Sequence, residues 1–109
     1  MSEFTAKRIG FLIKRSEMTL DEFTRHWEKI HAVLCQKLPG LRRYSINIID
    51  RGKYPRVAYD GFSELWFDSV EAHDAAFFSP EGVALLADIP NFVSDLCGVV
   101  VTEKQFIWP

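Results

Sequence analysis

The stretch TLDEFTRHWEKIHAVLCQKLPGLRRY, residues 19–44, decides the fold, because it holds a complete helix and the start of the strand that follows. Thr19 and Glu22 have the spacing of a capping box, which marks the beginning of a helix. Pro39-Gly40 ends the helix. Between these signals, apolar residues recur at spacings of three and four, the pattern of an amphipathic helix that packs on a sheet: Leu20, Phe23, Trp27, Ile30, Leu34 and Leu38.

Strand patterns surround this helix. Residues 6–14 are rich in β-branched and aromatic side chains and predict a buried strand. In residues 41–50, Tyr44 and two isoleucines alternate with polar residues, which predicts a strand with two different faces. The sequence FSELWF, residues 62–67, predicts a third strand, and residues 99–108, which begin VVVT, predict the fourth.

A second helical region separates the third and fourth strands. Asp68 or Ser69 is expected to cap its start, and Pro90 ends it. The pair Ser79-Pro80 restarts the helix with proline at the first helical position. The resulting order, βαββαβ, predicts an α+β, ferredoxin-like fold with the helices on one face of an antiparallel sheet.

The opposite face of such a sheet would be uncovered. An exposed apolar sheet face is a large adhesive patch on a monomer, and a second copy of the same sheet would cover it. We therefore expect residues 1–109 to form a single domain that assembles as a homodimer.

The composition narrows the class of protein. The chain has 109 residues, of which 48% are hydrophobic, and 13 basic and 15 acidic residues give a formal net charge of −2. The charges are mixed along the chain and form no basic field for phosphates, so no nucleic-acid partner is expected. There is no apolar signal core and no stretch long enough to cross a bilayer, so we expect no membrane association. Cys35 and Cys97 have no metal-ligand or redox spacing, which fits reduced thiols in a cytoplasmic protein.

His31 lies within the apolar stripe of the first helix, about 40° from Trp27 at ~100° per residue. A desolvated imidazole in that place is suited to proton exchange near neutral pH. A core histidine satisfied by one backbone carbonyl fits the same pattern, and the periodicity leaves both interpretations open. His26 is five residues earlier and is expected to diverge from His31 into solvent, which argues against a metal pair.

Three further residues are candidates for chemistry. Tyr44 follows the helix and could donate a hydrogen bond to a carbonyl or enolate oxygen, or could place its hydroxyl in water. Asp60 and Glu64 flank the start of the third strand and could orient a histidine. Glu64 needs a partner such as Arg42, Arg43 or a histidine, and a structural salt bridge is the alternative use. Because no metal-ligand set and no phosphate loop is evident, the sequence indicates proton transfer without a cofactor or a metal.

The run of residues 14–44 resembles the signature of the EthD-like family, an extended strand followed by a helix with W-x-x-x-H and then P-G-x-x-x-Y. The residues of the signature are Trp27, His31, Pro39, Gly40 and Tyr44. Residues 59–82 also resemble the third strand and second helix of that family, so the resemblance covers residues 7–107. It implies a dimeric α+β barrel with a pocket between sheet and helices. It also implies isomerases, cyclases, dehydratases or lyases of aromatic, ether or polyketide metabolism.

His31 and Tyr44 match positions that muconolactone-type isomerases of this group use near the lactone. Those enzymes carry a cysteine in the third strand, where this chain has Leu65, and this difference counts against the same isomerase reaction. With the resemblance included, His31 is expected to be the general base or acid and Tyr44 the oxyanion donor, with Asp60 or Glu64 as the orienting acid. Contacts to the substrate are expected from Trp27, Cys35, Leu65 and Phe77.

The function that we expect is that of a cofactor-independent lyase or isomerase, of the cyclase, dehydratase or isomerase type. The resemblance implies that its substrate is a small aromatic or polyketide-like catabolic metabolite. Two alternatives stay open at this point. One is a non-catalytic small-molecule-binding or accessory protein of a degradation pathway, and the other is a cofactor-less monooxygenase of the same barrel superfamily.

Overall fold

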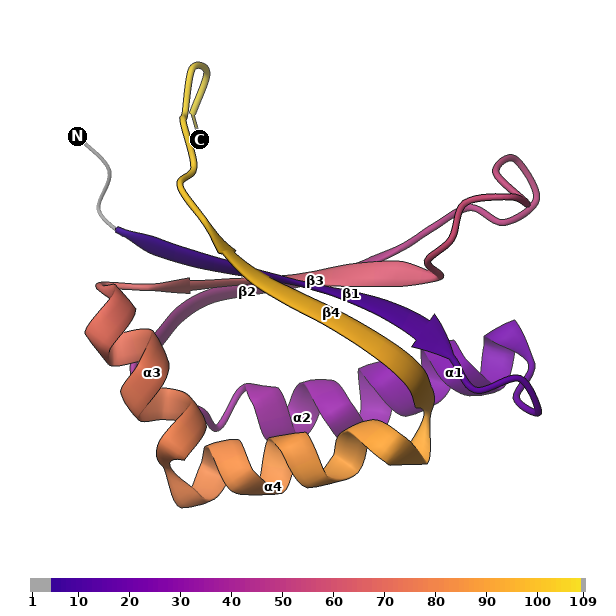
Figure 1. The fold of residues 1–109 in the computed structure, drawn as a ribbon, viewed down its shortest axis with the longest axis horizontal. Coiled ribbons are helices and arrows are strands. Elements are labelled where there is room, and N and C mark those ends of the chain that lie inside the picture. Colours follow the sequence, from indigo (N-terminus) through magenta and orange to yellow (C-terminus); the bar gives the residue numbers. More distant parts are fainter. Residues whose placement is uncertain (1–4, 109) are drawn as a thin grey trace.

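The computed structural model describes residues 5–108, which contain a four-stranded antiparallel sheet with helices on one face (Figure 1). The sheet order is β2-β3-β1-β4, so the first strand lies at the centre and the last at one edge. This arrangement confirms the predicted ferredoxin-like α+β fold. The strands are β1 (Ala6–Lys14), β2 (Leu41–Ile48), β3 (Gly61–Phe67) and β4 (Val93–Val101).

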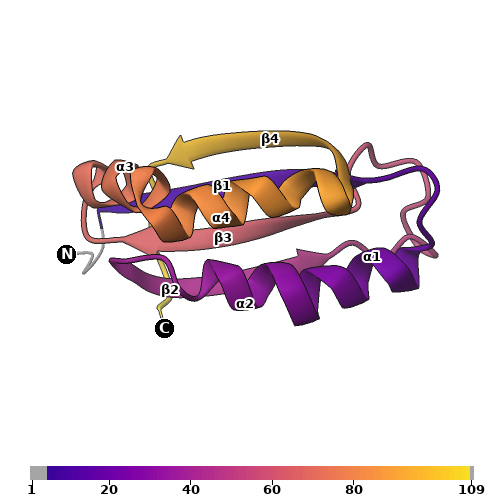
Figure 2. The same cartoon turned by 90° about the horizontal axis from the view of Figure 1, so that it is seen from below.

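The helices form two rows that run side by side beneath the sheet (Figure 2). The first row begins at the predicted capping box, in which the Thr19 hydroxyl accepts from Glu22 N at 3.1 Å and Glu22 Oε1 accepts from Thr19 N at 2.8 Å. It consists of α1 (Leu20–His26), a π-helical segment η1 (Trp27–His31) and α2 (Ala32–Cys35). The second region consists of α3 (Val70–Phe78), α4 (Pro80–Asp88) and a 3-10 turn η2 (Ile89–Asn91).

Of the two predicted caps of the second helical region, Ser69 is confirmed, because its hydroxyl accepts from Ala72 N at 3.1 Å. One predicted strand is corrected. The fourth strand spans Val93–Val101, and the predicted strand at residues 99–108 is wrong for residues 102–108. β4 is an edge strand with exposed polar residues, so its first half lacks the continuous apolar run that identifies a buried strand.

The core lies between the helices and the sheet in two clusters. One is centred on Phe67, Leu65 and Cys35, and the other on Trp27 and Phe92. The buried faces of all four strands and both helical rows contribute to these clusters or pack against them. The site described below lies where the two clusters meet.

The opposite sheet face carries both apolar and charged side chains. Phe11 and Phe62 lie with their ring centroids 5.8 Å apart, and Val99 is 40% exposed. Lys7 Nζ lies 2.7 Å from Glu64 Oε2 on the same face. This face carries no helix, and the chain after β4 rises on its side of the sheet (Figure 1).

In the part of the chain that the structure describes, every helix is too short or too polar to cross a membrane.

Candidate active site

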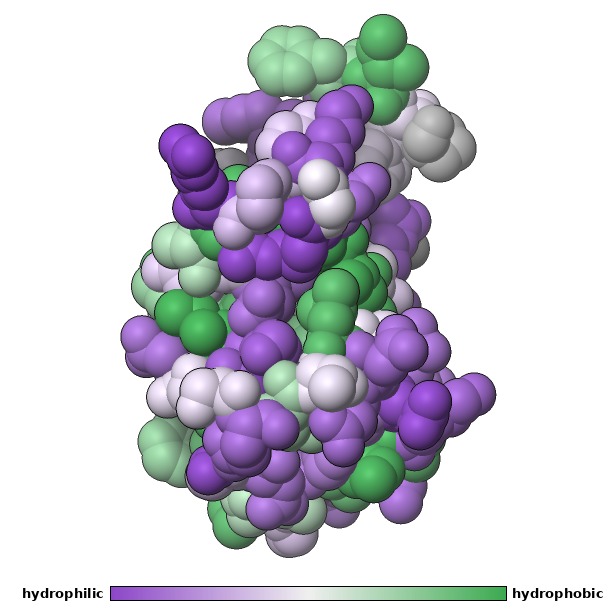
Figure 3. All heavy atoms as spheres, turned by 90° about the vertical axis from the view of Figure 1, so that its right-hand side faces the viewer, coloured by the Kyte–Doolittle hydropathy of each residue, from purple (hydrophilic) through white to green (hydrophobic). Residues whose placement is uncertain are grey.

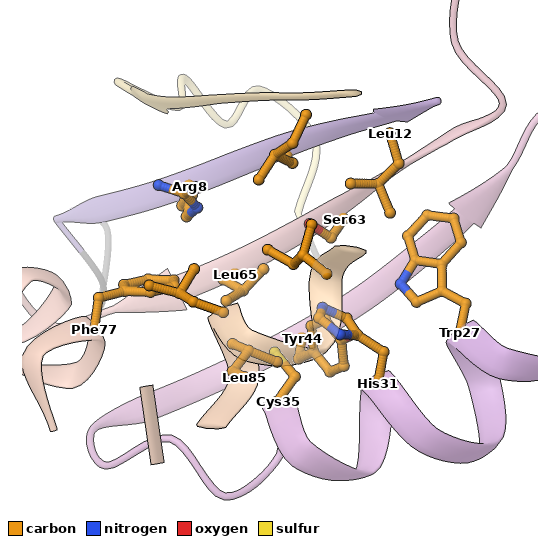
Figure 4. Close-up of a pocket in the computed structure, with 14 residues that line it drawn as sticks. Arg8, Leu12, Trp27, His31, Cys35, Tyr44, Ser63, Leu65, Phe77 and Leu85 are labelled. Carbon is orange, nitrogen blue, oxygen red and sulfur yellow. The ribbon is translucent and has the colours of Figure 1, made fainter. Parts of the chain in front are cut away.

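A cavity of about 40 Å³ lies between the helices and the sheet, with walls from all four strands and from helices of both rows (Figure 4). Two of the four residues predicted to act in catalysis and all four predicted to contact substrate line it. They are His31, Tyr44, Trp27, Cys35, Leu65 and Phe77. The structure therefore brings together residues that are as many as 50 positions apart in the sequence, from Trp27 to Phe77.

Small residues on adjacent strands leave the space for this cavity. Gly10 at the centre of β1 pairs with Ser63 of β3 on one side and Gly98 of β4 on the other. A Cβ atom added at Gly10 would lie 2.9 Å from Ser63 Oγ and 3.6 Å from a methyl group of Leu96. At this level of the sheet, two of the three adjacent strands carry a glycine and the third carries a serine. The larger side chains around these three residues therefore enclose a void instead of filling it.

His31 lines the cavity from the first helical row and is 8% exposed. Its Nδ1 atom lies 2.9 Å from Asp88 Oδ2 at the end of α4. Its ring packs on Phe92, with centroids 4.8 Å apart. Its Nε2 atom has no protein partner among residues 5–108, so Nε2 is the nitrogen available to a molecule in the cavity.

Asp88 is the centre of a buried polar cluster. Its side chain is 7% exposed, and it accepts from Asn91 Nδ2 at 3.0 Å. His26 Nε2 lies 3.0 Å from both of its oxygens. Burial opposes ionisation of this carboxyl, but the hydrogen bonds from Asn91, His31 and His26 hold its pKa below the ordinary value. Asp88 is therefore the anionic partner of His31.

The π-helical segment explains how two histidines reach one carboxylate. In a regular α-helix, residues five apart differ by about 140° around the axis. In η1 the Ala32 N–H donates to Trp27 O, five residues back, and the wider turn brings residues at that separation onto one side. His26 therefore faces Asp88 with His31, and the expectation that it diverges into solvent is wrong. Its side chain is 16% exposed.

The surroundings of His31 favour its neutral form. Burial lowers its pKa, and the hydrogen bond and charge of Asp88 offset this only in part. A neutral imidazole beside an ionised carboxylate places its proton on Nδ1, where Asp88 accepts it. The lone pair is then on Nε2. This tautomer can accept a proton from a molecule in the cavity.

Tyr44 and Cys35 remain protonated in the cavity wall. Burial raises the pKa of Tyr44, so its hydroxyl is a hydrogen-bond donor at any physiological pH. Burial also raises the pKa of Cys35 to about 12, which leaves it a neutral thiol and a poor nucleophile. Trp27 Nε1 is buried and points toward the cavity (Figure 4). Its N–H acts on the Tyr44 oxygen and lowers the pKa of that hydroxyl, but it has no acceptor in hydrogen-bonding geometry among the described residues. An oxygen atom of a ligand would satisfy this donor.

Asp60 and Glu64, the two predicted orienting acids, do not line the cavity. Asp60 accepts from Lys14 N at 2.9 Å and lies 3.4 Å from Arg51 Nε. Glu64 lies on the opposite sheet face, where Lys7 is its cationic partner in place of the expected arginines or histidine. Both carboxylates have structural partners, and neither lies beside His31.

Sequence reasoning missed Asp88, although a signal was present. Residues 82–88, GVALLAD, end in a single acid after an apolar run, immediately before a proline-containing turn. An acid at the buried end of a helix needs a partner. Asp88 is 57 positions from His31 in the sequence, so no local pattern indicated that the two residues pair. Arg8 and Ser63 were also missed, and both line the cavity.

Among residues 5–108, no group of three His, Cys, Asp or Glu side chains is arranged to hold a metal ion.

Solved structures with this fold include proteins of several kinds. An EthD family protein from Bacillus halodurans is 25% identical, with a TM-score of 0.80 over 92% of this chain and 99% of that one. A dimeric ferredoxin-like protein of unknown function from Thermobifida fusca is 18% identical, with a TM-score of 0.72 over 94% of each chain. More distant structures share the fold at 12% identity. A hydroxynitrile lyase from Passiflora edulis has a TM-score of 0.70 over 97% of this chain and 99% of that one. SnoaB, a cofactor-independent oxygenase from Streptomyces nogalater, has a TM-score of 0.67 over 97% of this chain and 98% of its own.

Sequence comparison identifies the family. An uncharacterized 11.0 kDa protein of Rhodococcus erythropolis, from the thcB-thcC intergenic region, is 31% identical over 88 residues, which are 80% of this chain and 84% of the relative. Residues 15–95 match the EthD domain, and this range includes His31, Tyr44 and Asp88. The chain is a member of the EthD family.

Proposed function

We propose that the protein is a cofactor-independent lyase or isomerase in which His31 moves a proton of a small metabolite. One observation carries this proposal: a buried carboxylate holds Nδ1 of His31, which lines a cavity, while Nε2 of the same ring has no protein partner among residues 5–108. A histidine that served only the core would have no need of a void beside its unpaired nitrogen. Base catalysis by a positioned imidazole contributes roughly 10²–10⁴-fold in rate.

The proposed reaction begins on a carbon next to a carbonyl. His31 Nε2 takes the proton from that carbon, and the C–H electron pair forms an enolate, so that the carbonyl oxygen gains charge. Protonated His31 then either returns the proton to another atom of the enolate or delivers it to a leaving group, such as a hydroxyl on the neighbouring carbon, as the C–O bond breaks. The Tyr44 hydroxyl, and the Trp27 N–H with it, would donate hydrogen bonds to the oxygen that gains charge. Return of the proton to a different atom gives an isomerase, and loss of the leaving group gives a lyase.

The wall of the cavity supports a small, partly aromatic substrate. It is lined mostly by apolar and aromatic side chains, and its polar groups are few and converge from different elements. At about 10–15 Å³ for each water, the space as it stands holds a few water molecules. Leu86 of α4 both lines the cavity and is 42% exposed, so this side chain marks the place where a substrate would enter.

The uncovered sheet face supports a homodimer as the working form. Phe11, Phe62 and Val99 lie on this face, and a second copy of the sheet would cover them. Figure 3 shows apolar spheres at the extremity that carries the C-terminal segment, where Phe106 and Ile107 are 93% and 94% exposed. Light scattering at micromolar concentration should give twice the chain mass, and a monomer across that range would rule the dimer out.

Hydrogen exchange into the substrate tests the proton transfer directly. In D₂O, a proton that His31 removes from carbon is replaced by deuterium when it returns, and NMR detects the loss of the carbon-bound proton signal. We would incubate the protein with a panel of small aromatic ketones, hydroxy acids and hydroxynitriles. The matched control is His73→Gln, because His73 is equally buried, has its own aspartate partner, Asp74, and packs behind the cavity-lining Phe77 without lining the cavity itself.

The results separate three kinds of protein. Exchange or conversion that is lost in His31→Gln and kept in His73→Gln supports the proposal. Ligand-dependent stabilisation with no exchange for any compound would overturn it in favour of a binding module. Consumption of oxygen with the substrate would overturn it in favour of a cofactor-independent oxygenase.

A further inference from the structure

Arg8 lies on the cavity side of β1, although no motif in the sequence singled it out. Successive residues of a strand point to opposite faces, so Arg8 shares the helix-side face with Gly10 and Leu12. Its guanidinium lies 4.8 Å from the ring centroid of Phe77. Figure 4 places Arg8 and Phe77 at one end of the cavity and Trp27 at the other, with His31 between them.

This arginine has no acidic partner. Among residues 5–108, no carboxylate lies within ion-pair distance of Arg8. The buried acid Asp88 is paired with two histidines, and Glu64 lies on the other face of the sheet. Burial also disfavours the charged form and lowers the pKa of Arg8, although the group stays ionised. A partly desolvated cation with unused donors on a cavity wall is arranged to meet an anion.

The neighbouring strand is shaped to hold the guanidinium in place. Gly98 of β4 lies beside Arg8, and a Cβ atom at this position would clash with Nη2 and lie 2.7 Å from Cζ. Glycine weakens a strand interior and often marks the close approach of another group. Here it lets the guanidinium approach the β4 backbone closely, while the Phe77 ring lies 4.8 Å from the guanidinium carbon. The N–H donors of the Arg8 guanidinium are therefore held in position before a ligand binds.

We propose that Arg8 binds a carboxylate of the substrate, so that the enzyme acts on a small carboxylic acid. The assignment of the ligand as the substrate rests on the proposed function, but the binding of a carboxylate does not. Arginine presents paired N–H donors that match both oxygens of a carboxylate. With the carboxylate at Arg8, the rest of the molecule extends toward His31 and Tyr44. The strand from Arg8 to Leu12 spans about 13 Å, which bounds the length of the substrate.

Binding of simple acids tests this proposal without turnover. Acetate and benzoate are titrated into the ¹⁵N-labelled protein at millimolar concentration, each beside its neutral amide, acetamide or benzamide, and with phenylphosphonate as a second anion. The signal of the Arg8 Nε–H group reports binding at the site. Arg8→Gln removes the charge, and Arg56→Gln removes a matched charge from an exposed loop. His31→Gln leaves the proposed carboxylate site intact.

We expect a carboxylate to shift the Arg8 signal and its amide to have little effect. Arg8→Gln should weaken binding at least about tenfold, the effect of roughly 1.4 kcal/mol, while Arg56→Gln binds as the wild type does. His31→Gln should keep the carboxylate-dependent shift of the Arg8 signal, because Arg8 is unchanged. Gly98→Ala should also weaken binding, because its Cβ displaces the guanidinium, and it tests the site if Arg8→Gln does not fold. The proposal is overturned if neither acid binds, if amides bind equally, or if phenylphosphonate binds better than benzoate. If carboxylates bind at Arg8 but no compound exchanges a carbon-bound proton, the result contradicts the proposed reaction and leaves the carboxylate site supported.

Discussion

Replacement of Asp88 by asparagine tests the orientation of His31 most sharply, because it keeps the size of the side chain and removes its charge. Both oxygens of Asp88 accept hydrogen bonds, Oδ2 from His31 and Oδ1 from Asn91, and His26 contacts both. An asparagine accepts at one end only, so at least one buried donor loses its acceptor. A hydrogen bond to a charged group contributes about 1.5–3 kcal/mol, and we expect a loss of that size in the free energy of unfolding.

The same variant should change the titration of His31. Asp88 raises the pKa of His31 against the effect of burial, so its removal should lower that pKa further. The acid limb of the pH–rate profile should then move to lower pH, while the plateau rate falls because the imidazole tautomer is no longer fixed. Histidine ring signals in NMR titrations and denaturant unfolding at neutral pH measure the two effects.

Asp74→Asn is the matched control for this experiment. Asp74 also contacts a buried histidine, His73 Nδ1 at 2.9 Å, but its own side chain is 59% exposed. Exposed ion pairs contribute less than about 1 kcal/mol, so this variant should be nearly neutral. If Asp88→Asn costs no more than Asp74→Asn, or if the pKa of His31 stays the same, Asp88 does not orient His31 as described.

Three further predictions follow from the same contacts. Tyr44→Phe should lower the rate of conversion by roughly 10²–10³ with little change in thermal midpoint, because it removes one donor to the developing oxyanion; a rate equal to that of the wild type would exclude Tyr44 from that role. The free energy of unfolding should fall on acidification below about pH 6.5, because the pKa of His31 is lower in the folded protein and the unfolded chain therefore binds this proton first. It should fall again below about pH 4, because the pKa of Asp88 is also lower in the folded protein. A free energy of unfolding that is constant across both pH ranges would contradict these two shifts. Cys35, whose pKa burial raises to about 12, should resist alkylation in the folded protein, and rapid modification at neutral pH would show that the cavity wall opens freely.

The periodic parts of the molecule could be predicted from the sequence. The apolar spacing and the capping box of the first helix, and the alternation around Tyr44, reflect local geometry, and local geometry is what periodicity records. His31 was predicted on the buried side from its roughly 40° offset to Trp27 in a regular helix, and both side chains are buried although the segment is π-helical. The strand at Val93–Val101 was misplaced because an edge strand mixes polar and apolar residues.

The polar cluster of the site could not be predicted in the same way. The π-helical segment rotates the residues before it by a fraction of a turn relative to the residues after it. A regular helical wheel therefore places His26 on the solvent side of the helix, whereas it faces Asp88 in the structure. Asp88 meets His31 through tertiary packing of two helices, and a single sequence contains no record of that contact. Arg8 could not be predicted as a site residue, because its proposed role depends on its having no acidic partner, and only the folded structure shows that.

The central claim is that His31 transfers protons and does not merely fill the core. The measurement that tests it most directly pairs the rate of carbon-proton exchange with the thermal midpoint for His31→Gln, on the first compound of the panel that exchanges. We predict that exchange is lost while the midpoint stays within a few degrees of the wild type or rises, because functional residues are often not optimal for stability. A large fall in the midpoint, with the remaining folded protein exchanging at the wild-type rate, would show that His31 is a core residue and would contradict the proposed function.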